Sequence, residues 1–401
     1  MTSTLFASVE MAPRDPILGL SEAFNADARP TKVNLGVGVY CDDNGRIPLL
    51  AAVRAAEKAR LEAAPPRGYQ PIEGPAAYNQ AVQGLIFGSS SPLLAAGRVV
   101  TVEALGGTGA LKVGADYLRR LLPQAAVHIS DPSWENHRAL FEAAGFKVEN
   151  YPYHDATTQG VNFAAMKAAL NGLPAGTIVV LHACCHNPTG ADLDERQWRE
   201  VVETVQVRNL VAFIDMAYQG FADGIEPDAL ALRLFADSGL SFFVSSSFSK
   251  SFSLYGERVG ALSIVTANRE ESARVLSQVK RVVRTNYSNP PTHGGAIVAA
   301  VLSNAELRSM WEGELAGMRD RIRAMRGGLV DKLAARGIER DFSFVARQRG
   351  MFSYTGLSAA QVERMKTEYG IYAVSTGRIC LAALNSRNLD YVADAIAAII
   401  R

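Results

Sequence analysis

The sequence predicts an α/β protein whose largely parallel β-sheet is covered by helices on both faces. Between residues 46 and 310, short apolar segments rich in Val, Ile, Leu and Phe alternate with longer segments of helical periodicity. Such alternation is typical of strand–helix–strand units, whose right-handed crossovers place helices on both sides of the sheet. A chain of 401 residues with 48% hydrophobic content can also bury more than one core.

Six segments are predicted to be strands, and five segments between them are predicted to be helices. The strands are expected at 99–104, 127–130, 177–183, 210–214, 241–245 and 260–265. The helices are expected at 108–122, 135–144, 162–171, 194–206 and 227–237. Residues 177–181 form a nearly continuous apolar run, which indicates a central strand buried on both faces.

The two ends of the chain are predicted to lie outside this unit. Residues 1–13 are expected to form an N-terminal arm that docks elsewhere or on a partner subunit, because so short a segment packs poorly alone. A helical pattern over 305–336, with arginines among its apolar positions, predicts a helix that bridges two domains. We therefore expect a large domain at 46–317 and a smaller α+β domain made of 14–45 and 318–401.

Charge and cysteine content restrict the partners and the compartment. The net charge is +1, from 41 basic and 40 acidic residues, so neither nucleic acid nor an anionic membrane surface is an expected partner. Four cysteines without metal spacing fit a reducing compartment without structural disulfides. No signal peptide and no apolar run of membrane-spanning length is recognisable. A cytoplasmic location is the expectation.

A lysine follows the predicted strand at 241–245. The apolar run breaks into serines and ends at Lys250, and Arg258 comes eight residues later. A lysine at the end of a buried strand, with a lowered pKa, can form a Schiff base with a carbonyl compound. The serine hydroxyls and Arg258 can bind a phosphate beside it. A lysine next to a phosphate site suggests pyridoxal 5'-phosphate (PLP); the alternative is a solvated lysine after an ordinary strand.

The turn between the strand at 99–104 and the next helix is rich in glycine. Gly106, Gly107 and Thr108 precede the helix, so free backbone N–H groups and the helix dipole can bind an anion there. Lys112 stands where a dinucleotide-binding pattern requires its third glycine, so that pattern is not matched. The alternative is a tight packing turn.

Three further strand ends carry residues suited to a flat, charged ring. Trp134 can stack on a heteroaromatic ring, although a core tryptophan is the alternative. Asp215 is a poorly solvated carboxylate that needs a cationic partner, such as a protonated pyridine nitrogen, unless it is an N-cap or ion-pair residue. Tyr218 and Asn187 can donate hydrogen bonds to a ring oxygen, and the bond from Asn187 to Pro188 allows a cis peptide.

The segment around Asn187 also contains two histidines and two cysteines. His182, Cys184, Cys185 and His186 are all zinc-ligand types, but their compact spacing does not match the usual zinc patterns. We therefore predict no metal site.

Together these motifs resemble the fold-type I, class I aminotransferases, in the same chain order and over nearly the whole chain. The segments at 186–190, 217–220, 246–250 and 286–291 are similar to the aspartate/aromatic amino acid aminotransferase subgroup. The segments at 254–260 and 350–362 are similar to its bacterial aromatic members. The resemblance implies a mostly parallel seven-stranded sheet sandwiched by helices, a PLP-binding domain at 46–317, and a smaller α+β domain.

The resemblance also implies a role for each residue toward the cofactor. Lys250 holds PLP and moves a proton between the substrate α-carbon and the cofactor, while Asp215 pairs with the pyridine nitrogen. Asn187 and Tyr218 bind the ring oxygen, and Trp134 stacks on the ring. The residues implied for the phosphate are Gly106, Gly107, Thr108, Ser247, Arg258 and, from the other subunit, Tyr69.

For the substrate, the resemblance implies two arginines and a shared site. Arg378 clamps the α-carboxylate with Gly36, Trp134 and Asn187 beside it, and Arg284 reaches across a homodimer to a side-chain carboxylate. The implied reaction is a ping-pong transfer, through pyridoxamine phosphate, from tyrosine, phenylalanine, aspartate or glutamate to 2-oxoglutarate. Three alternatives stay open at this point: a strict aspartate aminotransferase, a PLP-dependent lyase and a non-catalytic PLP-binding regulator.

Overall fold

A seven-stranded sheet forms the centre of the computed structural model, which describes residues 4–13, 15 and 17–401. Residues 1–3 of the predicted arm, and residues 14 and 16, lie outside the described residues. The strand order is β2-β10-β9-β8-β7-β3-β4, and only β10 runs antiparallel to its neighbours. The strands, in chain order, are β2 Val99–Leu105, β3 Ala126–Asp131, β4 Lys147–Pro152, β7 Ile178–His182, β8 Val211–Met216, β9 Phe242–Ser247 and β10 Val259–Val265.

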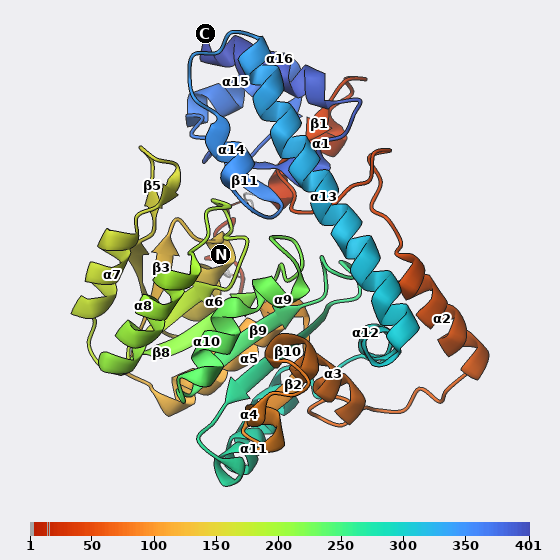
Figure 1. Cartoon of the computed structure of the whole chain (residues 1–401), viewed down its shortest axis with the longest axis vertical. Helices are drawn as coiled ribbons and strands as arrows, with labels where there is room; N and C mark the ends of the chain where they lie inside the picture. Colours follow the sequence, from red (N-terminus) through yellow and green to blue (C-terminus); the bar gives the residue numbers. More distant parts are fainter. Residues whose placement is uncertain (1–3, 14, 16) are drawn as a thin grey trace.

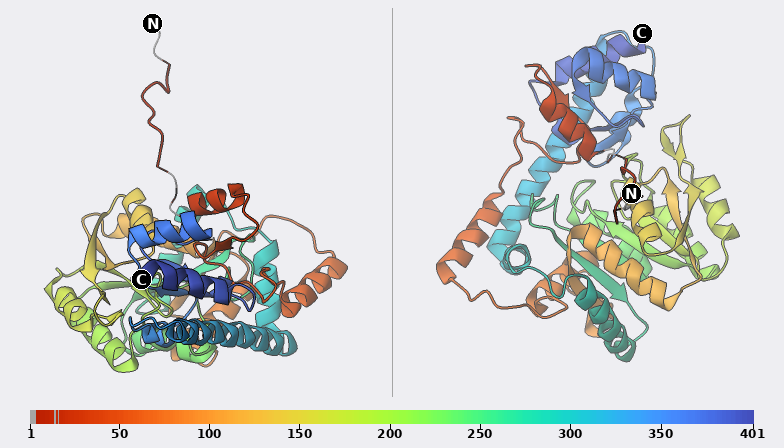
Figure 2. Two further views of the ribbon diagram at one scale, coloured as in Figure 1. Left: turned by 90° about the horizontal axis from the view of Figure 1, so that it is seen from above. Right: turned by 180° about the vertical axis from the view of Figure 1, so that it is seen from behind.

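Helices cover both faces of this sheet, as Figures 1 and 2 show. On one face Phe213 and Phe243 pack with α5 Gly106–Leu121, α6 Glu135–Ala143 and α11 Arg269–Asn286. On the other face Ile214 and Val244 pack with residues of α3 Ala76–Phe87, α7 Phe163–Gly172, α8 Glu195–Val207 and α10 Leu230–Asp237. Successive strand residues point to opposite faces, so strands covered on both faces must be apolar at every position.

Two details of the sequence prediction are wrong. The predicted helix at 227–237 is two helices, α9 Ile225–Asp228 and α10 Leu230–Asp237. The edge strand β4 was not predicted, because the exposed Lys147 and Asn150 and the half-buried Glu149 interrupt its apolar pattern. A strand with one open edge needs fewer apolar residues than a central one.

A single long helix joins the sheet to the C-terminal part of the chain. This helix, α13 Ala305–Ala335, has 31 residues and ends one residue before the end of the predicted helix at 305–336. It packs first against α2 Ala51–Ala63 and α12 His293–Ser303, and later against α14 Ser343–Arg347 and α16 Leu389–Ile400 (Figure 1). The division into domains at residues 46 and 318 stays a prediction.

Two segments, one from the N-terminal part of the chain and one from the C-terminal part, pair beside this long helix. The short strands β1 Val33–Asn34 and β12 Ile371–Tyr372 pair in parallel. Nearby, β11 Phe352–Tyr354 and β13 Arg378–Cys380 pair antiparallel. The remaining elements are α1 Leu18–Ala26, α4 Pro92–Ala95, β5 His154–Asp155, β6 Gly160–Val161, α15 Ala359–Tyr369 and a 3₁₀ turn at Leu381–Ala383.

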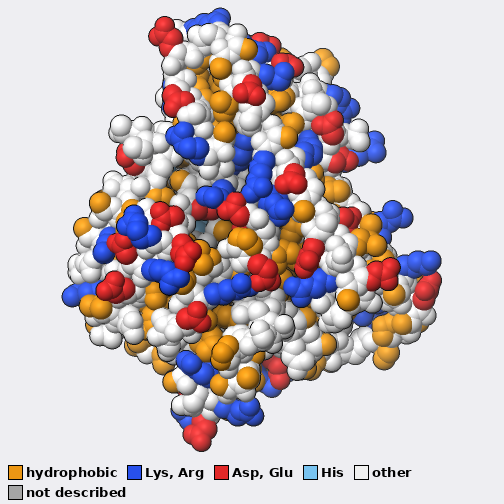
Figure 3. All heavy atoms as spheres, viewed as in Figure 1, with side chains coloured by type: hydrophobic (Ala, Val, Ile, Leu, Met, Phe, Trp, Pro, Cys, Tyr) orange, Lys and Arg blue, Asp and Glu red, His pale blue; other side chains and the backbone are white. Residues whose placement is uncertain are grey.

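The surface has two further features of interest. Residues 4–13 extend away from the body in Figure 2, and the side chains of Leu5, Phe6, Val9 and Met11 are exposed. On the face seen in Figure 3, acidic and basic side chains are interspersed. In the part of the chain that the structure describes, no helix is long and apolar enough to cross a membrane.

One carboxyl group is buried in the sheet without an ion-pair or hydrogen-bond partner for its Oε2 atom among the described residues. Glu103 of β2 is 2% exposed, and burial raises its pKa to about 8. A Cβ atom at Gly295 would lie 2.1 Å from Glu103 Oε1, and one at Gly74 would lie 2.6 Å from Glu103 Cβ. The two glycines therefore make the room that the carboxyl group occupies.

This raised pKa predicts a loss of stability as the pH rises from about 5 to about 8. The folded-state pKa of Glu103 lies above its unfolded value, so its contribution is favourable only at low pH and is lost as the pH rises toward about 8. Glu103→Gln keeps the shape and removes the titration. We expect the free energy of unfolding of the wild type to fall relative to Glu103→Gln between about pH 5 and pH 9, measured by urea denaturation. Parallel pH profiles for the two proteins would contradict this.

Candidate active site

A cavity of about 240 Å³ lies at the carboxyl edge of the sheet. Its walls come from the ends of β2, β7, β8 and β9, together with segments from both ends of the chain. Open parallel sheets bind their ligands at this edge. Ten of the predicted site residues line the cavity: Gly107, Thr108, Trp134, Asn187, Asp215, Tyr218, Ser247, Lys250, Arg258 and Arg378.

Lys250 stands in the turn that follows β9, with its amino group inside the cavity. The Nζ atom lies 4.8 Å from the centre of the Tyr218 ring. Burial, with the positive charges of Arg258 and Arg378, lowers the pKa of Lys250 to about 8, while Asp215 acts in the opposite direction. A substantial fraction of the amine is therefore neutral near physiological pH, and a neutral amine is a nucleophile and a base.

Asp215 provides a fixed negative charge at the end of β8. Its carboxylate is 7% exposed; Oδ1 accepts a hydrogen bond from Ser245 at 2.7 Å, and Oδ2 lies 2.9 Å from His137 Nε2. Burial favours protonation, but the contacts with His137 and Ser245 hold the pKa of Asp215 below its usual value. Asp215 is therefore a carboxylate at neutral pH. His137 was not predicted, although it lies one turn into the helix after Trp134.

One end of the cavity is built to receive an anion. Helix α5 begins at Gly106, so its first N–H groups lack partners within the helix, and its first turn has no acidic residue. Arg258 lies beside this helix end, where its Nη1 donates to Ser249 Oγ at 3.3 Å and its carbonyl accepts from Gly106 N at 3.0 Å. A Cβ atom at Gly106, which has φ +69°, would lie 2.6 Å from Arg258 Nη2. Any larger residue at position 106 would therefore displace the Arg258 guanidinium.

The other end carries a buried guanidinium. Arg378 of β13 is 1% exposed; its Nη1 donates to Asn187 Oδ1 at 3.1 Å and its Nη2 to Gly36 O at 2.7 Å. Its Nε has no partner among the residues that the structure describes. Its Cζ atom lies 4.4 Å from the centre of the Phe352 ring. A buried cation with a free N–H and no acidic hydrogen-bond partner suits a carboxylate ligand.

Two predicted site residues lie away from the cavity of this chain. Tyr69 is 95% exposed, and Arg284, at the end of α11, donates to Ser288. The two residues line a separate hollow on the surface, next to Tyr287 and residues 288–291. Their predicted roles require a second subunit and stay predictions. Gly36 and Gly106 do not line the cavity, but they contact Arg378 and Arg258.

Several residues that line the cavity are not among the individual site residues named from the sequence. They are Ile17, Gly38, Leu111, His182, Cys184, Ala217, Ser249, Tyr255 and Phe352. Ile17 and Phe352 come from segments far from the lysine in the sequence and carry no recognisable chemical motif. Only the fold brings them to the site.

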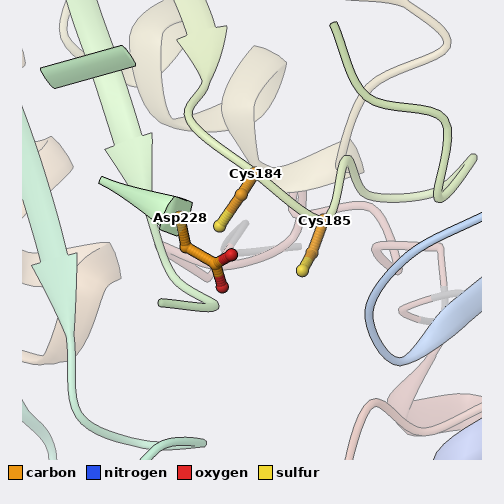
Figure 4. A group of neighbouring side chains, drawn as sticks. All are labelled: Cys184, Cys185 and Asp228. Atoms are coloured by element: carbon orange, nitrogen blue, oxygen red, sulfur yellow. The ribbon is translucent and has the colours of Figure 1, made fainter. Parts of the chain in front are cut away.

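The histidines and cysteines around Asn187 do not gather into one cluster. Cys184, Cys185 and Asp228 do come together, with potential ligand atoms within 4.8 Å of one another (Figure 4). However, the Asp228 carboxylate already accepts four backbone N–H bonds, from Gly220, Ala222, Asp223 and Gly224 at 2.8 to 3.2 Å. The contact between the two thiols together with burial raises the pKa of Cys184, and burial raises that of Cys185. This group therefore fixes the loop at 220–224 and is poorly suited to a cation.

A mostly parallel sheet with a lysine, a buried carboxylate and two arginines at its carboxyl edge is the arrangement of the fold-type I transferases. The predicted fold class is confirmed by solved structures of that class. The crystal structure of an aromatic-amino-acid aminotransferase from Burkholderia pseudomallei, covalently bound to pyridoxal phosphate, is 71% identical. Its TM-score is 0.97, and the match covers 99% of this chain and 100% of that one.

The chain belongs to the aminotransferase class I and II family, whose model matches residues 30–396. An aspartate aminotransferase of Pseudomonas aeruginosa is 70% identical over 99% of this chain and 100% of its own. The aromatic-amino-acid aminotransferase of Escherichia coli is 51% identical over the same shares. The prediction of an aminotransferase from the sequence is thereby confirmed.

Proposed function

We propose that this aminotransferase exchanges amino groups between 2-oxoglutarate and both aromatic and dicarboxylic amino acids, namely tyrosine, phenylalanine, aspartate and glutamate. The observation that carries the proposal is a single cavity in which Lys250 and Asp215 lie between Arg258 and Arg378. Its cofactor is PLP, for which the residues fit: a helix N-terminus with Arg258 for the phosphate, and a buried carboxylate for the ring nitrogen.

The roles of the residues follow from their positions. When bound, PLP supplies an aldehyde and a ring that withdraws electrons from the substrate α-carbon. Asp215 keeps the positive charge of the ring nitrogen stable in a buried site, and its contacts with His137 and Ser245 keep Asp215 ionised. Asn187 and Tyr218 would bind the ring oxygen of the cofactor, and Trp134 would stack on its ring.

Lys250 binds the cofactor and moves the proton. Because its pKa is lowered to about 8, the amine can take a proton from the substrate α-carbon and deliver it to the cofactor. The phosphate is held by the N–H groups of Gly107 and Thr108, by Ser247 and by Arg258. Arg378 binds the α-carboxylate through the N–H groups that face the cavity.

The proposed enzyme is a homodimer with shared sites, located in the cytoplasm. Tyr69 and Arg284 lie exposed and together on this chain, where a two-fold axis can carry them to the cavity of a second copy. We also propose two domains, 46–317 and 14–45 with 318–401. Because Lys250 lies in the first and Arg378 in the second, movement between them opens and closes the substrate end of the cavity.

The cavity supports a dual substrate range rather than a strict preference for aspartate. Ile17, Leu111 and Phe352 give it an apolar wall, which suits an aromatic side chain. Arg284 supplies the charge that a side-chain carboxylate needs. The experiment that tests the proposal is a comparison of kcat/KM for aspartate and phenylalanine with 2-oxoglutarate as acceptor. Turnover of aspartate alone would contradict the dual range, and turnover of neither amino acid would contradict the whole proposal.

Arg284→Leu should separate the two substrates. We expect kcat/KM for aspartate to fall about 10²- to 10³-fold, because loss of a desolvated charge partner costs about 2–5 kcal/mol. The value for phenylalanine should stay within about threefold, since its ring needs no cation. Arg281→Leu, on the same helix, is the matched control. An equal loss for both amino acids would show that Arg284 does not read the side-chain carboxylate.

A further inference from the structure

A buried arginine lies outside the cavity with no carboxylate among its hydrogen-bond partners. Arg326, on α13, is 2% exposed, and its side chain donates only to backbone carbonyls. Burial lowers its pKa to about 10, so it is charged at neutral pH. An unpaired charge inside a protein is costly. The carbonyl dipoles around Arg326 offset this cost.

All four carbonyls belong to residues 345–352, the segment that runs from α14 through a short loop into β11. Arg326 Nη1 donates to Val345 O at 2.8 Å, and Nη2 donates to Gly350 O at 2.7 Å and to the carbonyls of Arg349 and Phe352. A planar guanidinium with several fixed donors can hold several carbonyls at once, whereas a lysine presents a single flexible point charge. Arg326 thus fixes the course of the loop at 345–352.

The last residue of that loop supports the carboxylate-binding arginine. The Phe352 ring lies 4.4 Å below Arg378 Cζ and meets the Tyr218 ring edge-on, with centroids 6.0 Å apart. Its third side is closed by Gly38, where a Cβ atom would lie 2.5 Å from Phe352 Cζ. With contacts on three sides, the ring has one position, and that position sets the plane of the guanidinium above it.

The same loop also contacts the turn that holds Asn187. Arg349 N donates to Gly190 O at 2.7 Å, and a Cβ atom at Gly190 would lie 2.6 Å from Phe352 O. Asn187 is the residue that accepts the hydrogen bond of Arg378 Nη1. Both supports of Arg378, the ring below it and the amide beside it, therefore depend on the loop that Arg326 holds.

We infer that Arg326 is a positioning residue for the carboxylate site, acting through Phe352 on Arg378. The inference rests on the proposed role of Arg378 in binding the substrate α-carboxylate. A bidentate arginine–carboxylate contact needs the two planes aligned, so a small rotation of Arg378 weakens every ligand that carries this carboxylate.

Arg326→Lys in the PLP-loaded enzyme tests this inference. The probes are succinate, a dicarboxylate, and 3-phenylpropionate, a monocarboxylate, because neither can donate an amino group. We expect both dissociation constants, measured from the absorbance change of the bound cofactor, to rise about tenfold, as the loss of one or two hydrogen bonds would give. The absorbance of the unliganded holoenzyme should be unchanged. A rise for succinate alone would place the effect away from Arg378 and overturn the inference.

A matched control and a double substitution make the result specific. Arg336→Lys changes the residue that caps the C-terminus of the same helix and also loses bonds to carbonyls, of Lys332 and Asp390, but these are remote from the loop at 345–352. Its dissociation constants should stay within about twofold of the wild type. Phe352→Leu should weaken both probes by itself, and adding Arg326→Lys to it should change them little further, because the two residues act in series.

The outcomes distinguish this inference from the proposed function. A wild-type holoenzyme that binds neither probe contradicts the role proposed for Arg378. If the wild type binds both probes, and Arg326→Lys lowers only the melting temperature, the inference is overturned and the proposed function still stands. If Arg326→Lys does not fold, Phe352→Leu carries the test, and unchanged dissociation constants in that variant overturn the inference.

Discussion

Lys250→Ala is expected to lose at least about 10⁴-fold in kcat while keeping its fold. Positioned acid–base catalysis alone contributes about 10²- to 10⁴-fold, and this variant also loses the group that binds the cofactor covalently. The side chain lies in the cavity wall, so its removal takes no apolar contact from the main core. Initial rates with aspartate and 2-oxoglutarate measure the loss, and far-UV circular dichroism measures the fold.

Two companion variants show what the lysine contributes. Lys250→Arg keeps a positive charge but cannot become a neutral amine near pH 8, so we expect it to be as inactive as the alanine variant. Lys58→Ala removes a lysine that pairs with Glu62 on the exposed face of α2, and it should keep full activity. Wild-type rates in Lys250→Ala would end the proposal for Lys250.

Asp215→Asn is expected to reduce kcat about 10²- to 10³-fold. The amide keeps the size of the side chain and can still meet Ser245, but it leaves the charged ring nitrogen without a counter-charge. Removing one partner of a buried charge pair costs about 3–5 kcal/mol. Here the loss destabilises the protonated ring nitrogen, so the cofactor withdraws electrons less well. Single-turnover kinetics with aspartate, followed through the cofactor absorbance, measure this step directly.

An exposed aspartate provides the control for this second prediction. Asp394→Asn removes a carboxylate that pairs with Arg336 at the surface, and it should leave kcat within about twofold. Retention of wild-type kcat by Asp215→Asn would mean that the buried charge at the end of β8 has no role in the chemistry.

The parts of the site that follow strand ends were predictable from the sequence, because their signal is local. Asp215 comes directly after an apolar run and Lys250 follows another such run after a few serines, so the strand pattern alone places them at one edge of the sheet. The fold class was predictable for the same reason. The polar edge strand β4 was not, since an edge strand does not need an apolar pattern on both faces.

The supports of the site were not predictable, because they depend on contacts between distant segments. Phe352 and Gly38 meet only in the folded protein, and neither type of side chain suggests a ligand. The helical pattern places Arg326 on the same face as the apolar Ile322 and Leu329, unlike the exposed Arg323, but nothing in the sequence shows which carbonyls receive its hydrogen bonds. These bonds depend on the packing of α13 against the loop at 345–352.

The central claim is that Lys250 carries the cofactor with Asp215 behind the ring, and peptide mapping after borohydride reduction tests it most directly. Borohydride makes the bond between a lysine and the cofactor permanent, so that the modified peptide can be identified by mass spectrometry. We expect the purified protein to be yellow and the cofactor mass to be found on the peptide that contains Lys250. A colourless protein, or a cofactor fixed to another lysine, would contradict the claim.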